Sequence, residues 1–203
     1  MYVPEKESSR AVLIGSAHYT NAQLPELPAV ARNVDDLIDL LTTGKQSILD
    51  PAKCAILVDP VDARAVGQCL RREASQAIDL FLVYFAGHGL LDSRDDELYL
   101  ALHETDPDDP FFTAFPFDGI RRVMRDCPAR NRVLILDCCF SGRAMGDVMT
   151  GHTPVLAKID VAGTYVLTAT PANETAMAPA EATHTAFTGS LLSIFVSISA
   201  QSH

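Results

Sequence analysis

Short apolar runs alternate with amphipathic segments along most of this chain. Continuous apolar runs are typical of strands that a parallel sheet buries on both faces. We predict such strands at residues 11–15, 54–58, 78–85, 132–136 and 164–168. Apolar residues at every third or fourth position mark helices that cover a core with one face. We predict helices over residues 28–41, from Pro60 or Asp62 to about Ala74, and over residues 117–125 and 187–198. The alternation predicts an α/β domain with a mainly parallel sheet flanked by helices.

Three segments lack a clear period. Residues 98–102 are apolar and predict a short hairpin strand, whereas residues 103–116 are rich in Asp and Pro and predict a surface loop. Residues 142–163 show weak periodicity and contain Gly and Pro. We expect one domain over residues 1–203, and because the chain ends directly after an apolar helix, we expect it to be part of a longer protein.

Charge and composition limit the kinds of partner that the protein can bind. The formal net charge of −10 argues against a nucleic-acid backbone as the main partner. No apolar run is long enough to span a bilayer, and the polar first ten residues contain no signal-peptide core. These features predict a cytoplasmic protein without a membrane partner. The five cysteines are then expected to be reduced, and their spacing suggests neither disulfides nor a zinc site.

Two predicted strands end in residues that carry chemistry. One runs into Gly87-His88-Gly89, and the other into Asp137-Cys138-Cys139 followed by Phe-Ser-Gly. The carboxyl ends of parallel strands meet at one edge of a sheet, so His88 and Cys139 should lie close together. A thiolate is the reactive form of cysteine, and a neighbouring imidazole favours it and moves the proton. An isolated histidine would more simply be a loop residue that caps a helix.

The two motifs together resemble the caspase-like cysteine peptidases, nearest to metacaspases and their prokaryotic relatives. The interval of 51 residues from His88 to Cys139 agrees with caspases, although their Gln-Ala-Cys signature is absent. The resemblance extends over residues 10–193 and implies a caspase-hemoglobinase fold with a Cys139/His88 catalytic dyad. It also implies an oxyanion hole formed by the backbone N–H groups of Gly89 and Cys139.

Cys138 and Cys139 compete for the role of nucleophile. Adjacent side chains of a strand point in opposite directions, so only one can face the histidine. The resemblance decides for Cys139, because the nucleophile of these peptidases is the second residue after the aspartate. We expect Cys138 to be a small buried residue, as are Cys54, Cys69 and Cys127.

Asp137 precedes Cys139 by two residues and should point to the same side of the strand. In metacaspases an aspartate at this position belongs to a pocket that accepts Arg or Lys, so the resemblance implies that Asp137 binds the substrate. The alternative is a structural aspartate that caps the following helix.

A cofactor is not expected. Some metacaspases require calcium, and the acidic residues Asp92, Asp95, Asp96 and Glu97 follow the histidine. Their spacing matches no EF-hand loop, and neither does that of Asp106, Asp108 and Asp109. A solvated acidic turn is the simpler interpretation of both groups.

The sequence therefore predicts a cysteine endopeptidase that cleaves peptide bonds after Arg or Lys. Its relatives suggest an effector of a defence or signalling system, with a protein or peptide substrate and an attached or separate sensor domain. Two other classes stay open: a non-catalytic caspase-like scaffold, and a different cysteine hydrolase on a doubly wound sheet, such as an esterase or amidase.

Overall fold

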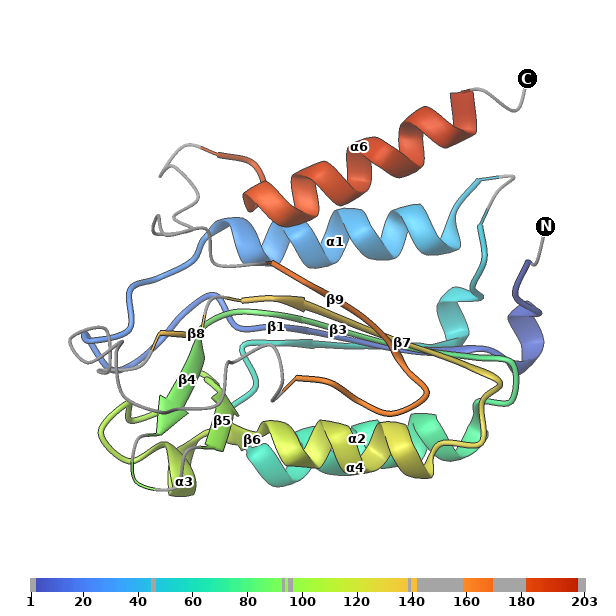
Figure 1. The fold of residues 1–203 in the computed structure, drawn as a ribbon. Helices are drawn as coiled ribbons and strands as arrows, with labels where there is room; N and C mark the ends of the chain where they lie inside the picture. Colours follow the sequence, from blue (N-terminus) through green and yellow to red (C-terminus); the bar gives the residue numbers. More distant parts are fainter. Residues whose placement is uncertain are drawn as a thin grey trace.

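A five-stranded parallel sheet forms the centre of the molecule (Figure 1). The computed structural model describes residues 3–44, 47–92, 94, 97–138, 140–141, 159–169 and 182–200. The strands lie in the order β2 (Cys54–Val58), β1 (Arg10–Gly15), β3 (Leu80–Ala86), β7 (Asn131–Asp137) and β9 (Tyr165–Thr168), and each pair is parallel. All five strands predicted from the apolar runs are confirmed.

Helices cover both faces of this sheet (Figure 1). One face carries α1 (Ala29–Thr42) and α6 (Ala186–Ala200), and the other carries α2 (Ala63–Gln76) and α4 (Phe117–Asp126). The predicted helices are confirmed, with ends shifted by one or two residues. Asp62 begins α2 as its cap, because its carboxylate accepts a hydrogen bond of 2.8 Å from the backbone N–H of Arg64.

Two cores lie between these layers. Tyr84 and Ile135 point into the core shared with α1 and α6, whereas Phe85 and Leu136 point into the core shared with α2 and α4. All residues of β1 and β3 are buried, because these strands have a neighbour on each side and helices on both faces. The edge strands β2 and β9 are partly exposed. Burial on both faces explains why the inner strands appear in the sequence as unbroken apolar runs.

A second, smaller sheet adjoins the carboxyl edge of the first. Its strands follow the order β6 (Phe115–Pro116), β5 (Glu97–Leu100), β4 (Gly89–Asp92) and β8 (Phe140–Ser141). The predicted hairpin strand is confirmed as β5, which pairs with β4 in antiparallel fashion.

The interpretation of residues 103–116 as a surface loop is wrong in part. This segment contains the short helix α3 (Pro110–Thr113) as well as β6, and Pro110, Ala114 and Phe115 are buried. Thr113 explains how so polar a segment folds, since its hydroxyl bonds to the main chain at Asp106 and Asp109. The Asp and Pro residues give the turns of a folded segment here.

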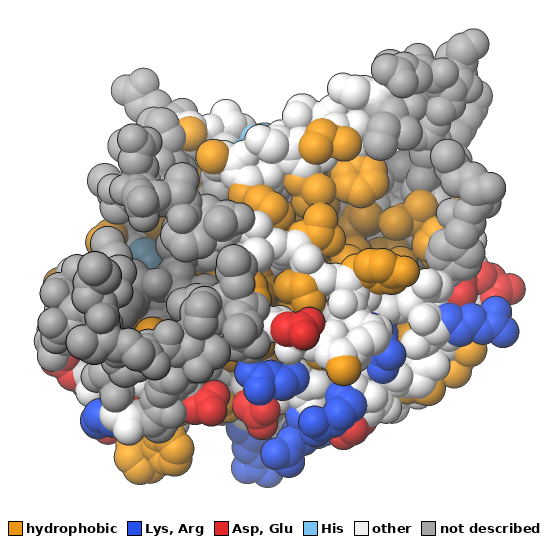
Figure 2. Space-filling model, in the orientation of Figure 1, with side chains coloured by type: hydrophobic (Ala, Val, Ile, Leu, Met, Phe, Trp, Pro, Cys, Tyr) orange, Lys and Arg blue, Asp and Glu red, His pale blue; other side chains and the backbone are white. Residues whose placement is uncertain are grey.

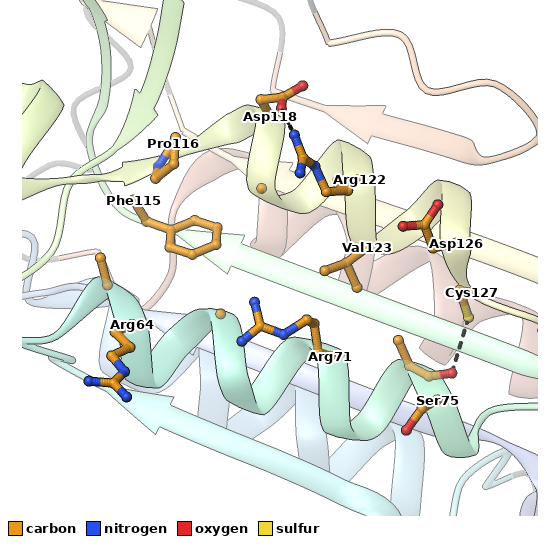
Figure 3. A pocket seen from close by; sticks show the side chains of 14 residues that line it. Arg64, Arg71, Ser75, Phe115, Pro116, Asp118, Arg122, Val123, Asp126 and Cys127 are labelled. Carbon is orange, nitrogen blue, oxygen red and sulfur yellow. Dashed lines mark hydrogen bonds and ion pairs between the residues drawn. The ribbon is translucent and has the colours of Figure 1, made fainter.

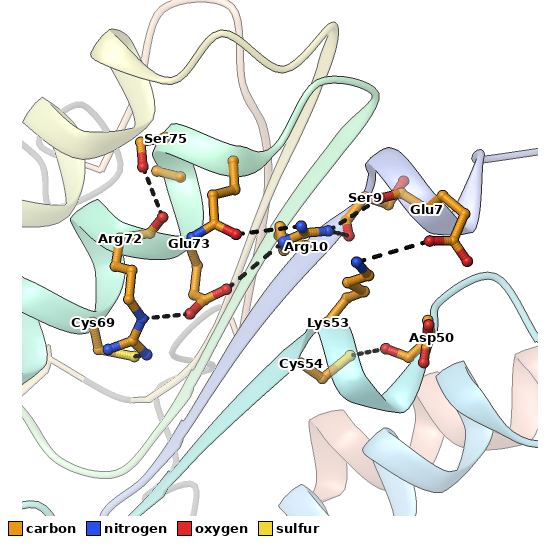
Figure 4. A network of polar contacts seen from close by, with 12 residues as sticks. Glu7, Ser9, Arg10, Asp50, Lys53, Cys54, Cys69, Arg72, Glu73 and Ser75 are labelled. Carbon is orange, nitrogen blue, oxygen red and sulfur yellow. Dashed lines mark hydrogen bonds and ion pairs between the residues drawn. The ribbon is translucent and has the colours of Figure 1, made fainter.

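A polar network closes the amino edge of the main sheet (Figure 4). The Arg10 guanidinium donates hydrogen bonds to the carbonyls of Glu7 and Ser9, at 3.2 and 2.9 Å, and lies 3.9 Å from the carboxylate of Glu73 on α2. Two short 3-10 helices, η1 (Lys6–Ser8) and η2 (Pro51–Lys53), lie beside it. The network ties β1 to α2 at the edge opposite the histidine and cysteine motifs, so we assign it a structural role.

None of the helices in the described part of the chain is long and apolar enough to cross a membrane.

Candidate active site

The carboxyl edge of the main sheet brings the two sequence motifs together. Ala86, the last residue of β3, pairs with Asp137, the last residue of β7. Immediately beyond, Gly89 in β4 pairs with Phe140 in β8, again in parallel. Both pairs join residues 51 positions apart, which is also the interval between His88 and Cys139 in the sequence. Cys139 itself lies outside the described residues, so its role as nucleophile stays a prediction.

His88 is oriented by the main chain. Its Nε2 lies 2.8 Å from the carbonyl oxygen of Pro25. Because a carbonyl can only accept a hydrogen bond, Nε2 carries the proton and Nδ1 carries the lone pair. The backbone N–H of His88 donates to the Tyr19 hydroxyl at 3.1 Å, and the two rings lie 5.0 Å apart. Desolvation lowers the pKa of His88 more than the bond to Pro25 raises it, so the imidazole is neutral at pH 7 and can accept a proton.

The loop that supplies the Pro25 carbonyl, residues 17–27, is held closed by a hydrogen bond between its two ends. The backbone N–H of Leu27 donates to the carbonyl of Ala17 at 2.8 Å and joins the two ends of the loop. Inside it, the Tyr19 hydroxyl donates to the carbonyl of Ser16 at 2.7 Å. Tyr19 therefore connects the end of β1 to the backbone of His88.

Asp59 anchors this loop to β2. One carboxylate oxygen accepts from the backbone N–H groups of Ala17 and His18, at 2.6 and 3.0 Å, and the other lies 2.7 Å from His18 Nδ1. Burial pushes the pKa of Asp59 upward, but the bonds from His18 and Ala17 outweigh it and keep that pKa below its usual value. The backbone of Asp59 has a φ of 46°, a left-handed conformation uncommon outside glycine. Sequence analysis missed this residue because a single aspartate after a strand is an ordinary turn residue.

The glycines beside His88 differ in their conformations. Gly87 has a φ of 156°, and a side chain there would meet the Tyr19 hydroxyl and the Phe85 ring at 3.0 Å. Gly87 therefore takes a backbone conformation that glycine favours, immediately before His88. Gly89 instead lies in β4 without a positive φ. The proposed contribution of its N–H to an oxyanion hole remains untested.

Asp137 lies in a buried polar cluster between β7, α1 and α6. Its side chain is 7% exposed, and one carboxylate oxygen accepts from Asn33 Nδ2 at 3.2 Å, from the Tyr84 hydroxyl at 3.3 Å and from Thr188 Oγ1 at 2.5 Å. Thr185 Oγ1 also donates to this oxygen. All four donors are neutral, and within the described residues Asp137 forms no ion pair. Sequence analysis missed Asn33, Tyr84 and Thr188, because each lies in a segment typical of a core helix or strand.

The other candidates are placed more simply. Cys138 is 4% exposed and packs in the core beneath α2 and α4, which confirms the prediction of a small buried residue. Cys69 and Cys127 are buried as predicted, whereas Cys54 is only half-buried because it lies on the edge strand β2. Asp92 binds Arg94 at 2.7 Å, while Asp95 and Asp96 lie outside the described residues. Where side chains are described, no three acidic, His or Cys residues are grouped so that they could hold a metal ion.

The comparisons agree with this arrangement. The sequence model of the caspase domain matches residues 8–201, and the chain belongs to this family of cysteine peptidases. The crystal structure of caspase-1 from Spodoptera frugiperda superposes with a TM-score of 0.63 at 15% identity, over 93% of this chain and 70% of that one. The structure of pro-sf-caspase-1 superposes with a TM-score of 0.60 at 16% identity, over 94% of this chain and 73% of that one. No match was found among curated protein sequences. At such identities the two structures bear on the fold alone.

Proposed function

We propose that this protein is a cysteine endopeptidase in which His88 and Cys139 form the catalytic dyad. The observation that carries the proposal is the parallel pairing of residues on both sides of the two motifs. The paired residues are separated by the same number of positions in the sequence as His88 and Cys139. The second support is His88 itself, which is neutral and held by Pro25 with Nδ1 as the basic nitrogen. Nδ1 would withdraw the thiol proton, and the thiolate would attack the peptide carbonyl to form a thioester.

The remaining steps use groups of the same chain. The protonated imidazole would donate its proton to the leaving amine and then activate the water that hydrolyses the thioester. The N–H groups of Gly89 and Cys139 would stabilise the oxyanion. No step draws on a cofactor or calcium. As in its prokaryotic relatives, the peptidase would act as a cytoplasmic effector controlled by an attached or separate sensor domain.

Cleavage after Arg or Lys is the specificity that Asp137 supports. A buried carboxylate is costly unless a positive charge compensates it, and the described donors to Asp137 are all neutral. A substrate guanidinium or ammonium group would supply the missing charge. Asp137 would thus both receive the substrate and hold α6 through Thr185 and Thr188.

The dyad is tested by three single variants. Cys139→Ala should abolish hydrolysis of Arg and Lys peptides, and Cys138→Ala should keep most of it because that residue faces the α2 and α4 core. His88→Ala should be about as damaging as Cys139→Ala, since members of one catalytic unit do not act additively. Peptidase assays on the folded variants decide the matter. An active Cys139→Ala protein would contradict the assignment of Cys139 as the nucleophile. A wild-type protein that cleaves only esters would favour the other class of cysteine hydrolase.

Specificity is tested by Asp137→Asn, which removes the charge but keeps an acceptor for Thr188. We expect kcat/KM for Arg peptides to fall by roughly several hundredfold, the loss typical of breaking a buried charge pair. Thr188→Val is the matched control, because it disturbs the same cluster and leaves the carboxylate charged. Equal losses in both variants would show that Asp137 acts through the fold alone. A wild type that prefers an acidic residue at the cleavage position would also reject this assignment.

A further inference from the structure

A groove runs between α2 and α4 (Figure 3). These helices lie on the face of the main sheet opposite α1 and α6 (Figure 1). Its volume is about 750 Å³. Phe115, Pro116 and Val123 contribute its apolar lining, and Arg71 reaches into it from α2, whereas Arg64 points away. The groove belongs neither to the catalytic edge nor to the proposed substrate pocket.

Two helix glycines keep the groove open. Gly67 on α2 and Gly119 on α4 both lie against the Phe115 ring. Glycine inside a helix costs about 1 kcal/mol relative to alanine, so its presence calls for a packing reason. A Cβ on Gly67 would be 3.5 Å from the Phe115 ring and 3.7 Å from Arg71 Nη1. The missing side chain therefore leaves a space that an aromatic edge and a guanidinium border together.

The charge of this surface is opposite to that of the whole protein. The chain has 16 basic and 26 acidic residues, for a net charge of −10. The helices α2 and α4 alone contain six arginines and only three acidic residues. Figure 2 shows these basic side chains gathered along the lower edge of the molecule. A cationic surface on an acidic protein indicates an anionic partner at this place.

The uncompensated charge is on the α2 side of the groove. On α4, Asp118 lies 3.6 Å from Arg122, and Asp126 lies 3.7 Å from Arg125. Arg71, by contrast, is exposed and forms no hydrogen bond or ion pair within the described part of the chain. A carboxylate placed in the groove would therefore meet Arg71, while an apolar side chain beside it would contact Phe115 and Val123.

We propose that this groove binds an acidic peptide segment of a partner protein, with an apolar residue over Phe115 and a carboxylate on Arg71. A peptide fits better than a nucleic acid, because Asp118 and Asp126 on the rim would repel a regular phosphate backbone, and the apolar floor offers it no partner. Both helices begin at the carboxyl edge of the sheet, so a bound segment could be held while the catalytic edge is occupied.

The test uses the whole chain with Cys139→Ala and a short fluorescent peptide that contains Leu and Glu but no Lys or Arg. We expect saturable binding by anisotropy and chemical-shift changes confined to α2, α4 and Phe115. Arg71→Glu should weaken binding about tenfold or more, as expected for the loss of a charge-assisted hydrogen bond. Arg125→Glu is the matched control, because it makes the same charge change on an exposed residue outside the groove, and should alter affinity less than about twofold.

Four results would overturn the proposal. They are an absence of binding, equal binding by the Arg71→Glu protein, equal binding of a peptide with Ser in place of Leu, and displacement of the peptide by a single-stranded oligonucleotide. A concentration-dependent dimer that blocks the peptide and is lost in Arg71→Glu would assign the groove to a second copy instead. None of these measurements depends on peptidase activity, so the outcome is independent of the proposed function.

Discussion

Two hydrogen bonds and partial burial set the chemistry of His88. Tyr19 holds its backbone, Pro25 holds Nε2, and partial burial keeps the ring neutral. In the proposed dyad, the ionisation of this histidine determines the lowest pH at which it can act as a base.

We predict that His88 titrates below pH 6.5 in the Cys139→Ala protein, where no thiolate can raise its pKa. The lowered pKa of His88 also makes the stability of the folded protein depend on pH. An imidazole with a depressed pKa in the folded state binds fewer protons than in the unfolded chain, so stability is kept above pH 6.5 and falls as the pH drops through the folded pKa. Histidine NMR titration measures the pKa directly. A measured pKa of His88 at or above 6.5 contradicts the desolvation argument. The control is the His88→Ala protein, which should lack this part of the pH dependence of unfolding.

Sequence reasoning at this scale succeeds for side chains and fails for main-chain partners. The position of the two motifs at strand ends predicted that β3 and β7 end side by side, and Cys138 is buried as the resemblance implied. The Pro25 carbonyl left no signal, because any residue presents a carbonyl. An aspartate after a strand, such as Asp59, is equally typical of an ordinary turn, so the sequence did not mark it as an anchor of the loop.

Among the elements, the glycines of α2 and α4 give a matched pair of substitutions. Gly67→Ala should raise the free energy of unfolding by about 0.5–1 kcal/mol, because its Cβ would make ordinary contacts at 3.5 Å and the helix gains rigidity. Gly119→Ala should instead lower it, because its Cβ would lie 2.9 Å from the Phe115 ring, which is buried. Urea unfolding of the two variants measures both changes. Equal changes of one sign would show that the Phe115 ring moves freely.

The small sheet marks the limit of prediction for elements. Long apolar runs predicted every strand of the main sheet, because burial on both faces leaves a strong pattern. The strands β4, β6 and β8 have two to four residues each and begin at Gly or Phe beside polar turns. Their pairing depends on segments far apart in sequence, which a local pattern does not record.

At the scale of the whole molecule, residues 159–169 and 182–200 are tied to the rest by contacts on two sides. The strand β9 pairs with β7 along its length, and Thr185 and Thr188 on the α6 side bind Asp137. Figure 2 shows apolar side chains over β9 and α6, and Tyr165, Leu167 and Ile194 are among the exposed ones. The tie matters for a cut in the chain between β7 and β9, because these contacts would hold the two pieces together.

We predict that a cut after Lys158, a basic residue between β7 and β9 in the sequence, leaves both pieces associated. Lys158 lies outside the described residues, but the pairing of β9 and the Asp137 cluster lie inside them. Native mass spectrometry after cleavage should find one particle, whereas denaturing mass analysis should find two chains. Thr188→Val should loosen the association. Fragments that separate on dilution in native buffer would contradict the prediction, and an active protein that remains one chain would show that cleavage is not required.

The partner that orients His88 is a carbonyl, and this has a consequence for how activity can be lost in descent. Substitution at Pro25 leaves that oxygen in place, whereas a change in the length of the loop between Ala17 and Leu27 would move it. If the proposed dyad is correct, a descendant of this protein can lose activity while both His88 and Cys139 are retained. A comparison of catalytic residues alone would classify such a relative as an enzyme. Only the length of its loop would indicate that it is a scaffold.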